Sequence, residues 1–137
     1  MSKKVFIIED DANVLYSLQA KFSLANIDVQ TDSGNTDISE LINGLKKNRQ
    51  DFIILDLILP KVDGFEILKA IKKDGDLASL PIFIFTSLND QDSKNRVLEL
   101  GIKYYFSKSD FNVDEFVNRV LKIINNKNKS STFTTGY

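Results

Sequence analysis

DFIILDLILPKVDG, residues 51–64, predicts a buried strand, a turn and the start of a helix. The apolar run at residues 52–55 is too short for a buried helix and rich in β-branched and aromatic side chains. Such a run favours a central strand covered on both faces. Asp56 follows at the carboxyl end of that strand, where open α/β sheets bind ligands, and Asp63 is better placed to cap the next helix. A single carboxylate could still be a solvated turn residue, so its role depends on what ends the other strands.

The same strand-then-helix pattern occurs five times along the chain. Apolar runs predict most of the strands, an alternating segment at residues 27–31 predicts a more exposed strand near the sheet edge, and capped amphipathic segments predict the helices that follow. The predicted strands span residues 5–8, 27–31, 52–55, 82–85 and 103–106, and the predicted helices begin near residues 13, 37, 63, 90 and 112. Gly75 and Gly101 are expected to end the third and fourth helices. The pattern predicts a doubly wound parallel α/β sheet with helices on both faces and all strand ends on one edge.

Chain length and composition indicate one globular domain followed by a polar tail. The 137 residues are 42% hydrophobic and 27% charged, which is typical of a globular protein with an ordinary core. Residues 1–125 are expected to form the domain, and residues 126–137 a flexible tail or linker. No apolar run approaches the ~20 residues that span a bilayer, so we expect a cytoplasmic protein without membrane contact. The net charge of −1 gives no reason to expect nucleic-acid binding.

The absence of cysteine and histidine narrows the chemistry open to the chain. Without cysteine there are no disulfides, no thiolate metal sites and no cysteine nucleophile. Without histidine there is no Ser-His-Asp triad, no imidazole-ligated zinc and no phosphohistidine on this chain. Reactions must therefore depend on carboxylates, hydroxyls and lysines, which favours a hard, oxygen-ligated cation such as Mg²⁺.

Charged and hydroxyl side chains follow four of the five predicted strands. They are Glu9 and Asp10 after the first strand, Asp56 after the third, Thr86 and Ser87 after the fourth, and Lys108 after the fifth. Three carboxylates at one edge would repel one another, and the pKa of at least one would rise unless a cation were bound. Mg²⁺ and the ammonium of Lys108 would offset their charge. A carboxylate nucleophile, a cation, a hydroxyl and a lysine together predict a site for a phosphoryl group.

Taken one at a time, these side chains have simpler explanations. Asp11, which follows the acidic pair, is more readily a helix cap than a ligand. Thr86 could simply end a strand, Lys108 could be a surface lysine, and Tyr105 could be a half-buried packing residue. Their joint placement at the ends of parallel strands favours the functional interpretation.

Over residues 3–125 the chain resembles the response-regulator receiver domain, the phosphoacceptor module of two-component signalling. The resemblance rests on five matches in the right order, which are far more specific than one short motif. They are the acidic pair Glu9 and Asp10, the D-x-x-x-P-x-x-D-G pattern of Asp56, Pro60, Asp63 and Gly64, the hydroxyl of Thr86, the aromatic ring of Tyr105, and Lys108. The family implies a flavodoxin-like fold with strand order 2-1-3-4-5 and five flanking helices.

The resemblance also implies roles for the acidic residues. Asp56 would take a phosphoryl group from a partner histidine kinase or histidine phosphotransfer protein. Mg²⁺ would be held by Asp10, Asp56 and the backbone carbonyl of Ile58, with Glu9 acting mainly through water. Such a domain is a signalling phosphoacceptor and not an enzyme, apart from its own phosphorylation and slow dephosphorylation.

Three further residues connect the phosphoryl group to the rest of the domain in this family. Thr86 and Lys108 would contact phosphoryl oxygens, and Thr86 would be drawn toward the group while Tyr105 turns inward. The fourth helix, fifth strand and fifth helix would then present a changed surface to an output domain or target protein. Homodimerisation on phosphorylation is a further expectation, whereas nucleic acid and membranes are not expected as direct partners.

Several positions depart from the family pattern or vary within it. Lys108 is followed by Ser109, where the family has proline after a cis bond. A cis bond before a non-proline residue costs ~3 kcal/mol, so a trans bond here could aim Lys108 differently. Ser87 replaces the usual alanine and adds a hydroxyl. Ile58 and Leu88 flank the site, and we hypothesise that these apolar side chains keep water away and lengthen the life of the acyl phosphate.

Two other functions stay open on these residues alone. One is a receiver-like interaction module that no longer switches by phosphorylation, for which Lys108-Ser109 is the only hint. The other is a Mg²⁺-dependent phosphohydrolase with Asp56 as nucleophile. Such an enzyme needs an acid or base two residues beyond its nucleophile, where this chain has Ile58. The phosphorylation-dependent switch is therefore the function that we expect.

Overall fold

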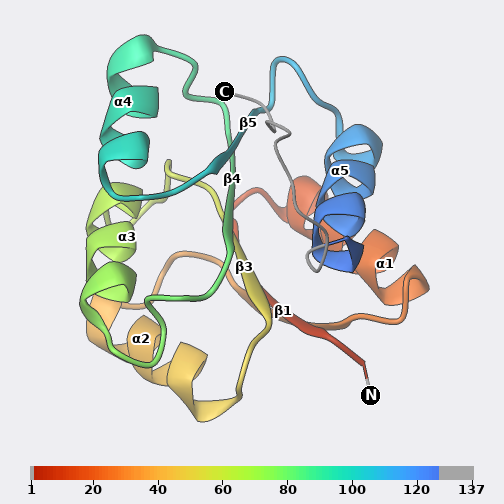
Figure 1. Ribbon diagram of the computed structural model, residues 1–137, viewed down its shortest axis with the longest axis horizontal. Coiled ribbons are helices and arrows are strands. Elements are labelled where there is room, and N and C mark those ends of the chain that lie inside the picture. Colours follow the sequence, from red (N-terminus) through yellow and green to blue (C-terminus); the bar gives the residue numbers. More distant parts are fainter. Residues whose placement is uncertain (1, 127–137) are drawn as a thin grey trace.

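The computed structural model describes residues 2–126 of the 137-residue chain. Strands and helices alternate along it in the order expected from the sequence (Figure 1). The elements are β1 (Lys4–Ile8), α1 (Ala12–Leu24), β2 (Asp28–Asp32), α2 (Ile38–Lys47), β3 (Phe52–Leu55), α3 (Gly64–Lys73), β4 (Ile82–Thr86), α4 (Gln91–Glu99), β5 (Tyr104–Ser107) and α5 (Val113–Asn125). The predicted tail, residues 126–137, lies outside the described residues except for Asn126.

The strands form one parallel five-stranded sheet in the order β2-β1-β3-β4-β5, which confirms the predicted topology. Helices α1 and α5 cover one face of the sheet, and α2, α3 and α4 cover the other (Figure 1). Every strand is followed by a helix that returns the chain to the opposite edge, so the carboxyl ends of all strands lie together. This edge is where the sequence predicts the functional site.

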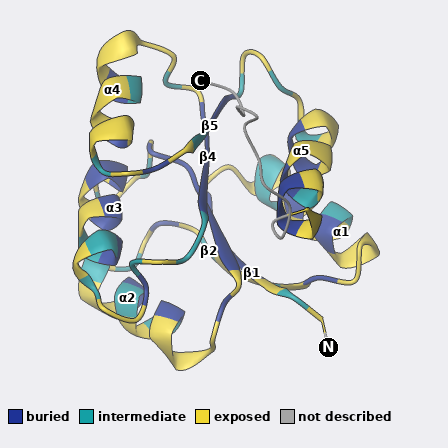
Figure 2. Cartoon of the chain, in the orientation of Figure 1, coloured by how far each residue is buried: buried dark blue, intermediate teal, exposed yellow. Residues whose placement is uncertain are grey.

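Burial of the strands follows their position in the sheet (Figure 2). Strands β3 and β4 are buried along their whole length, whereas the edge strand β2 has no fully buried residue. Side chains alternate between the faces, so Ile53 and Leu55 pack with α2, α3 and α4, while Phe52 and Ile54 pack with α1 and α5. Two apolar layers thus hold the central strands, and with them the residues at their ends.

Short polar side chains begin every helix. The N-caps are Asp11, Asp37, Asp63, Asp90 and Asn112, and each accepts a hydrogen bond from a backbone N–H of the first turn. Asn112 and Glu115 complete a reciprocal capping box at the start of α5. Within residues 2–126, no helix combines the length and the apolar character that crossing a membrane requires.

The two glycines that were predicted to end helices differ in backbone conformation. Gly101 ends α4 as expected, because its φ of 85° is the left-handed conformation that glycine adopts most readily. Gly75 directly follows the C-cap of α3, so the helix ends where expected, but Gly75 does not adopt the left-handed conformation. The C-cap is Asp74, in extended backbone, and its carboxylate accepts hydrogen bonds from the N–H groups of Asp76 and Leu77 in the turn that follows. A local side-chain turn therefore replaces the glycine stop.

Gly64, the first residue of α3, packs directly against the backbone that follows β3. A Cβ atom at this position would lie 2.5 Å from Cα and 2.6 Å from the carbonyl oxygen of Leu57. The N–H of Gly64 also donates to that carbonyl at 3.3 Å. The start of α3 is therefore held against the loop that carries Asp56, and only glycine fits the contact without a shift.

Candidate phosphoryl and metal site

The hydrogen-bond ladder of the sheet continues one residue past three strands and fixes the backbone of the predicted site. The N–H of Glu9 donates to the last carbonyl of β2 at 3.1 Å, and the N–H of Asp56 donates to the last carbonyl of β1 at 3.0 Å. The N–H of Lys108 donates to the last carbonyl of β4 at 2.8 Å. These three side chains therefore start from backbone that the sheet itself holds.

Glu9, Asp10 and Asp56 form the acidic cluster that the sequence predicts. One carboxylate oxygen from each residue lies within 4.8 Å of the other two. Glu9 and Asp56 are only 1% and 4% exposed, whereas Asp10 is exposed. The cluster therefore combines two shielded carboxylates with one that faces solvent, where a cation can enter.

Lys108 bridges the two buried carboxylates. Its Nζ lies 2.8 Å from Oε1 of Glu9 and 2.9 Å from Oδ2 of Asp56. The bond between Lys108 and Ser109 is trans, like every other peptide bond in residues 2–126, yet the side chain still reaches Asp56. Burial alone would lower the pKa of Lys108, but the hydrogen bond that Lys108 donates to Glu9 and the charge of Asp56 outweigh it, so the pKa is raised.

Glu9 is the carboxyl group whose ionisation the site opposes. Burial raises the pKa of Glu9 to about 7 despite the hydrogen bond from Lys108, and the charge of Asp56 adds to the rise. Its other oxygen, Oε2, accepts a hydrogen bond from the N–H of Asp11 at 3.1 Å. Both oxygens of Glu9 are thus engaged by the protein, in agreement with an indirect contact to a metal through water.

The donor set and charge of the cluster fit a divalent cation. Three ionised carboxylates and one ammonium leave two negative charges at the site. Carboxylate oxygens are the ligands that Mg²⁺ prefers, and a doubly charged ion would neutralise the remainder. Asp10 and Asp56 are the residues that would hold it, and its charge would favour the ionised form of Glu9.

Thr86, Tyr105 and Leu88 are connected beside the acidic cluster. Thr86 and Tyr105 are both 0% exposed. The N–H of Leu88 lies 3.4 Å from Oγ1 of Thr86, and the hydroxyl of Tyr105 donates to the carbonyl of Leu88 at 2.7 Å. Burial raises the pKa of Tyr105 to about 12, with smaller contributions from the charges of Asp90 and Asp56. Tyr105 therefore points inward, with its hydroxyl bonded to the loop that follows β4.

The predicted flanking residues differ in how they meet solvent. Ile58 is 46% exposed, and its N–H donates to Oδ1 of Asp56 at 3.1 Å, so both oxygens of Asp56 accept a hydrogen bond. Ser87 is exposed and Leu88 is half-buried. Ile58 therefore places an apolar, partly exposed side chain in the loop that directly follows Asp56.

Sequence reasoning missed Ser107, the last residue of β5. Its side chain is 1% exposed, and its Oγ lies 2.7 Å from Oγ of Ser109. The N–H of Ser109 also donates to Oγ of Ser107 at 3.2 Å. The two serines that flank Lys108 could have indicated this turn from the sequence. A serine side chain can accept a hydrogen bond from the N–H two residues later and so form a tight turn.

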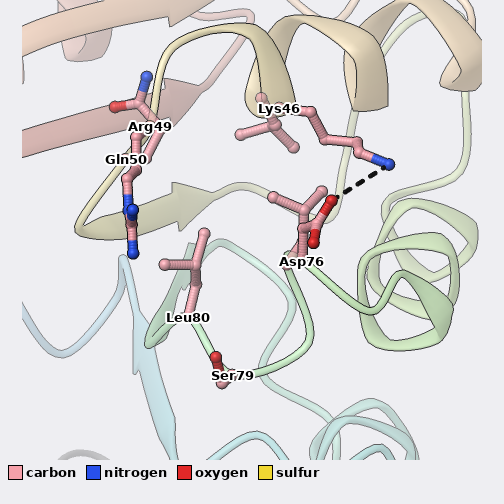
Figure 3. Close-up of a pocket in the computed structure, with 8 residues that line it drawn as sticks. Lys46, Arg49, Gln50, Asp76, Ser79 and Leu80 are labelled. Atoms are coloured by element: carbon pink, nitrogen blue, oxygen red, sulfur yellow. Dashed lines mark ion pairs between the residues drawn. The ribbon is translucent and has the colours of Figure 1, made fainter.

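A separate cavity of about 360 Å³ lies at the opposite edge of the sheet (Figure 3). Its lining residues precede β3 and β4: Leu45, Lys46, Arg49, Gln50, Asp76, Leu77, Ser79 and Leu80. Lys46 forms an ion pair there with Asp76 at 3.6 Å and another with Asp74 at 3.0 Å. The cavity shares no residue with the acidic cluster, so it plays no part in the chemistry of that site.

Comparison with known proteins gives a consistent result at the level of sequence. Residues 5–121 match the family model described as the response regulator receiver domain. A probable transcriptional regulator, ycf27 of Guillardia theta, is 32% identical over 129 residues, covering 94% of this chain and 48% of that protein. The chain spans about half the length of the curated relatives that it matches.

Solved structures give the same result for the fold. The phosphorylated cyanobacterial phytochrome response regulator RcpA superposes with a TM-score of 0.77 at 27% identity, covering 96% of this chain and 98% of that one. The Mn²⁺-bound form of response regulator Rcp1 superposes with a TM-score of 0.74 at 25% identity, covering 97% and 99% of the two chains.

Proposed function

The chain belongs to the response regulator receiver domain family of two-component signalling, and from this membership we propose that it is a phosphorylation-dependent switch with Asp56 as the phosphoacceptor. The observation that carries the proposal is the surroundings of Asp56. This buried carboxylate lies within 4.8 Å of two other acids and 2.9 Å from the ammonium of Lys108. A structural carboxylate would need only the lysine, so the extra acids support a cation-dependent reaction.

The reaction we assign is in-line transfer from a phosphohistidine of a partner histidine kinase or histidine phosphotransfer protein. An oxygen of Asp56 bonds to phosphorus as the P–N bond breaks, and the electron pair stays on the imidazole nitrogen of the partner. Lys108 and Thr86 would contact the phosphoryl oxygens, which gather negative charge during the transfer. Before the transfer, Lys108 holds Asp56 through one oxygen and so orients the other carboxylate lone pairs.

The cation that we propose is Mg²⁺, held by Asp10, Asp56 and the backbone carbonyl of Ile58. It would supply positive charge that offsets the acidic cluster and the phosphoryl oxygens. Support comes from the three clustered carboxylates and from a related receiver, Rcp1, whose structure contains Mn²⁺. Glu9 would contribute through water, because both of its oxygens are already bonded within the protein.

The output of the switch would be read from α4, β5 and α5. Tyr105 of β5 and Leu88 of the loop before α4 are joined by a hydrogen bond, so movement of Thr86 toward a phosphoryl group would act on both. The partners we propose are an output domain or a target protein, with a homodimer as a further outcome of phosphorylation. Each would bind by recognising one of two packings that exist before phosphorylation.

The direct test is incubation with acetyl phosphate and Mg²⁺, followed by intact mass measurement. We expect one added phosphoryl group per chain, dependent on Mg²⁺ and lost in Asp56→Asn. Asp63→Asn is the matched control, because Asp63 caps α3 away from the acidic cluster and the variant should still be modified. Absence of the adduct in wild type would favour a receiver-like interaction module, and continuous release of phosphate over many turnovers would favour a phosphohydrolase.

We assign the chain the role of a phosphoacceptor and not of an enzyme acting on other substrates. Multiple turnover would need a group that activates water beside the acyl phosphate, and the residue two positions beyond Asp56 is the apolar Ile58. The interaction module without switching loses its only specific support, because Lys108 reaches Asp56 despite the serine that follows it.

A further inference from the structure

Lys108 lies in the turn that follows β5. Its own N–H is bound to β4, and its side chain ends at Glu9 and Asp56. The residue after it is serine, so no proline ring restricts the backbone at this point. Other contacts must therefore fix the orientation of the Lys108 side chain at the end of β5.

The serines on either side of Lys108 make the required connection. Oγ of Ser107 accepts a hydrogen bond from the N–H of Ser109 at 3.2 Å and shares a second one with Oγ of Ser109 at 2.7 Å. The carbonyl of Ser107 also accepts from the N–H groups of Asp110 and Phe111 at 3.0 and 3.1 Å. Ser107 thus binds three successive residues after the lysine and closes the turn around it.

The position of the Ser107 side chain is itself well determined. Ser107 is 1% exposed and lies at the last paired position of β5, opposite Thr86 of β4. A buried hydroxyl at the end of a strand has few rotamers, so the turn it closes has little freedom. Ser109 is exposed and is held from the inside by its buried neighbour.

We propose that Ser107, through its hydroxyl contacts with Ser109, is the positioning residue that aims Lys108 at Asp56. This proposal deepens the proposed function and rests on it, since Lys108 acts there on the phosphoryl group. The hydrogen bonds of Ser107 go to the turn after Lys108, so its role is to position the lysine and not to bind the phosphoryl group. Ser107 would keep the ammonium of Lys108 in place before the reaction. The entropy cost of ordering the lysine is then not added to the barrier of the transfer step.

The test compares Ser107→Ala with wild type in two measurements. The first is the rate of phosphorylation by acetyl phosphate at saturating Mg²⁺. Loss of one or two hydrogen bonds predicts a maximal rate about 3- to 10-fold lower. The acetyl phosphate concentration giving half the maximal rate should change by less than about twofold, because the lost contact acts on the transfer step and not on binding.

The second measurement needs no phosphorylation. The ammonium signal of Lys108 in a nitrogen-detected NMR spectrum of the unphosphorylated, metal-free protein is assigned by its loss in Lys108→Arg. We expect a slowly exchanging signal in wild type, and faster exchange with water in Ser107→Ala. If wild type takes no phosphoryl group, the proposed function fails, and the NMR comparison still decides whether Ser107 positions the lysine.

Three further variants make the outcome decisive. Ser107→Thr keeps a hydroxyl and should restore both the rate and the slow exchange. Ser109→Ala leaves the buried residue intact and should give a smaller loss, which keeps the idea testable if Ser107→Ala folds poorly. Ser79→Ala removes an exposed serine at the opposite edge and should change nothing. Wild-type rate and exchange in both Ser107→Ala and Ser109→Ala would overturn the proposal.

Discussion

Lys108 fixes the orientation of the Asp56 carboxylate through a hydrogen bond to one of its oxygens. One ammonium holds two buried carboxylates at 2.8 and 2.9 Å, and each carboxylate also accepts a backbone N–H, from Asp11 in the case of Glu9 and from Ile58 in the case of Asp56. Removing one partner from such a buried group leaves an unpaired charge, which costs far more than the bond itself contributes. The residues of this site should therefore be considered as one unit.

Ile58 gives a prediction about the life of the acyl phosphate. Its side chain is 46% exposed at the rim beside Asp56, where it can shield the phosphoryl group from water. We expect Ile58→Asn to lose the phosphoryl group several-fold faster than wild type, because an amide replaces an apolar cover. The measurement is the decay of the phosphorylated mass after the phosphodonor is removed.

The control for this variant is Leu24→Asn. Leu24 is the last residue of α1, outside the proposed output surface, and is 84% exposed, so the change also removes exposed apolar surface away from Asp56. Its decay should equal that of wild type. An unchanged or slower decay in Ile58→Asn would rule out a shielding role for Ile58.

At the scale of elements, the contact between α3 and the loop after β3 gives a stability prediction. Gly64→Ala would place a Cβ 2.5 Å from Cα of Leu57, and both sides of that contact are backbone. Neither side can move aside freely, so we expect the free energy of unfolding to fall by about 1–3 kcal/mol. Urea denaturation followed by circular dichroism measures the change.

Gly44→Ala is the opposing control within the same fold. Gly44 lies inside α2, and a Cβ there would have no neighbour within 4 Å. Alanine favours a helix over glycine, so this variant should be more stable by about 0.5–1 kcal/mol. If the two variants shifted stability in the same direction, the close contact at Gly64 would not be the cause.

The elements themselves could be predicted from sequence because their signals are local. Apolar runs, the alternating pattern at residues 27–31 and the capping residues placed the strands and helices near their observed bounds, and the sheet order came from the family resemblance. Gly75 lies just past the end of α3 as predicted, but the side chain of Asp74, which was not predicted to take part, closes the turn there. Side-chain directions were beyond local reasoning: the buried hydroxyl of Ser107 and the inward Tyr105 depend on contacts with other strands and loops.

At the scale of the whole molecule, the raised pKa of Glu9 makes stability depend on pH. The pKa of Glu9 rises from 4.5 to about 7 on folding. The folded state therefore holds its proton more tightly, and the stability this gives is present below pH 4.5 and lost as pH rises to about 7. In the metal-free protein, Glu9→Gln should become more stable relative to wild type over that interval, by up to about 3 kcal/mol.

Chemical denaturation at several pH values, with a chelator present, measures this difference. Glu66→Gln serves as control, since Glu66 is an exposed residue paired with Lys69 and should give a curve parallel to wild type. A constant difference between Glu9→Gln and wild type from pH 4.5 to 8 would contradict the prediction. Ionisation of Glu9 would then have no effect on the free energy of unfolding.

The buried hydroxyl of Tyr105 also makes intrinsic tyrosine fluorescence a reporter of the state of the domain. The chain contains no tryptophan, so the weaker emission of its four tyrosines is not masked. Tyr105 is completely buried and bonded to a backbone carbonyl, whereas Tyr16 is 74% exposed. A change in the bond between Tyr105 and Leu88 would alter the emission of Tyr105. The state of the domain could thus be followed in real time without an attached dye.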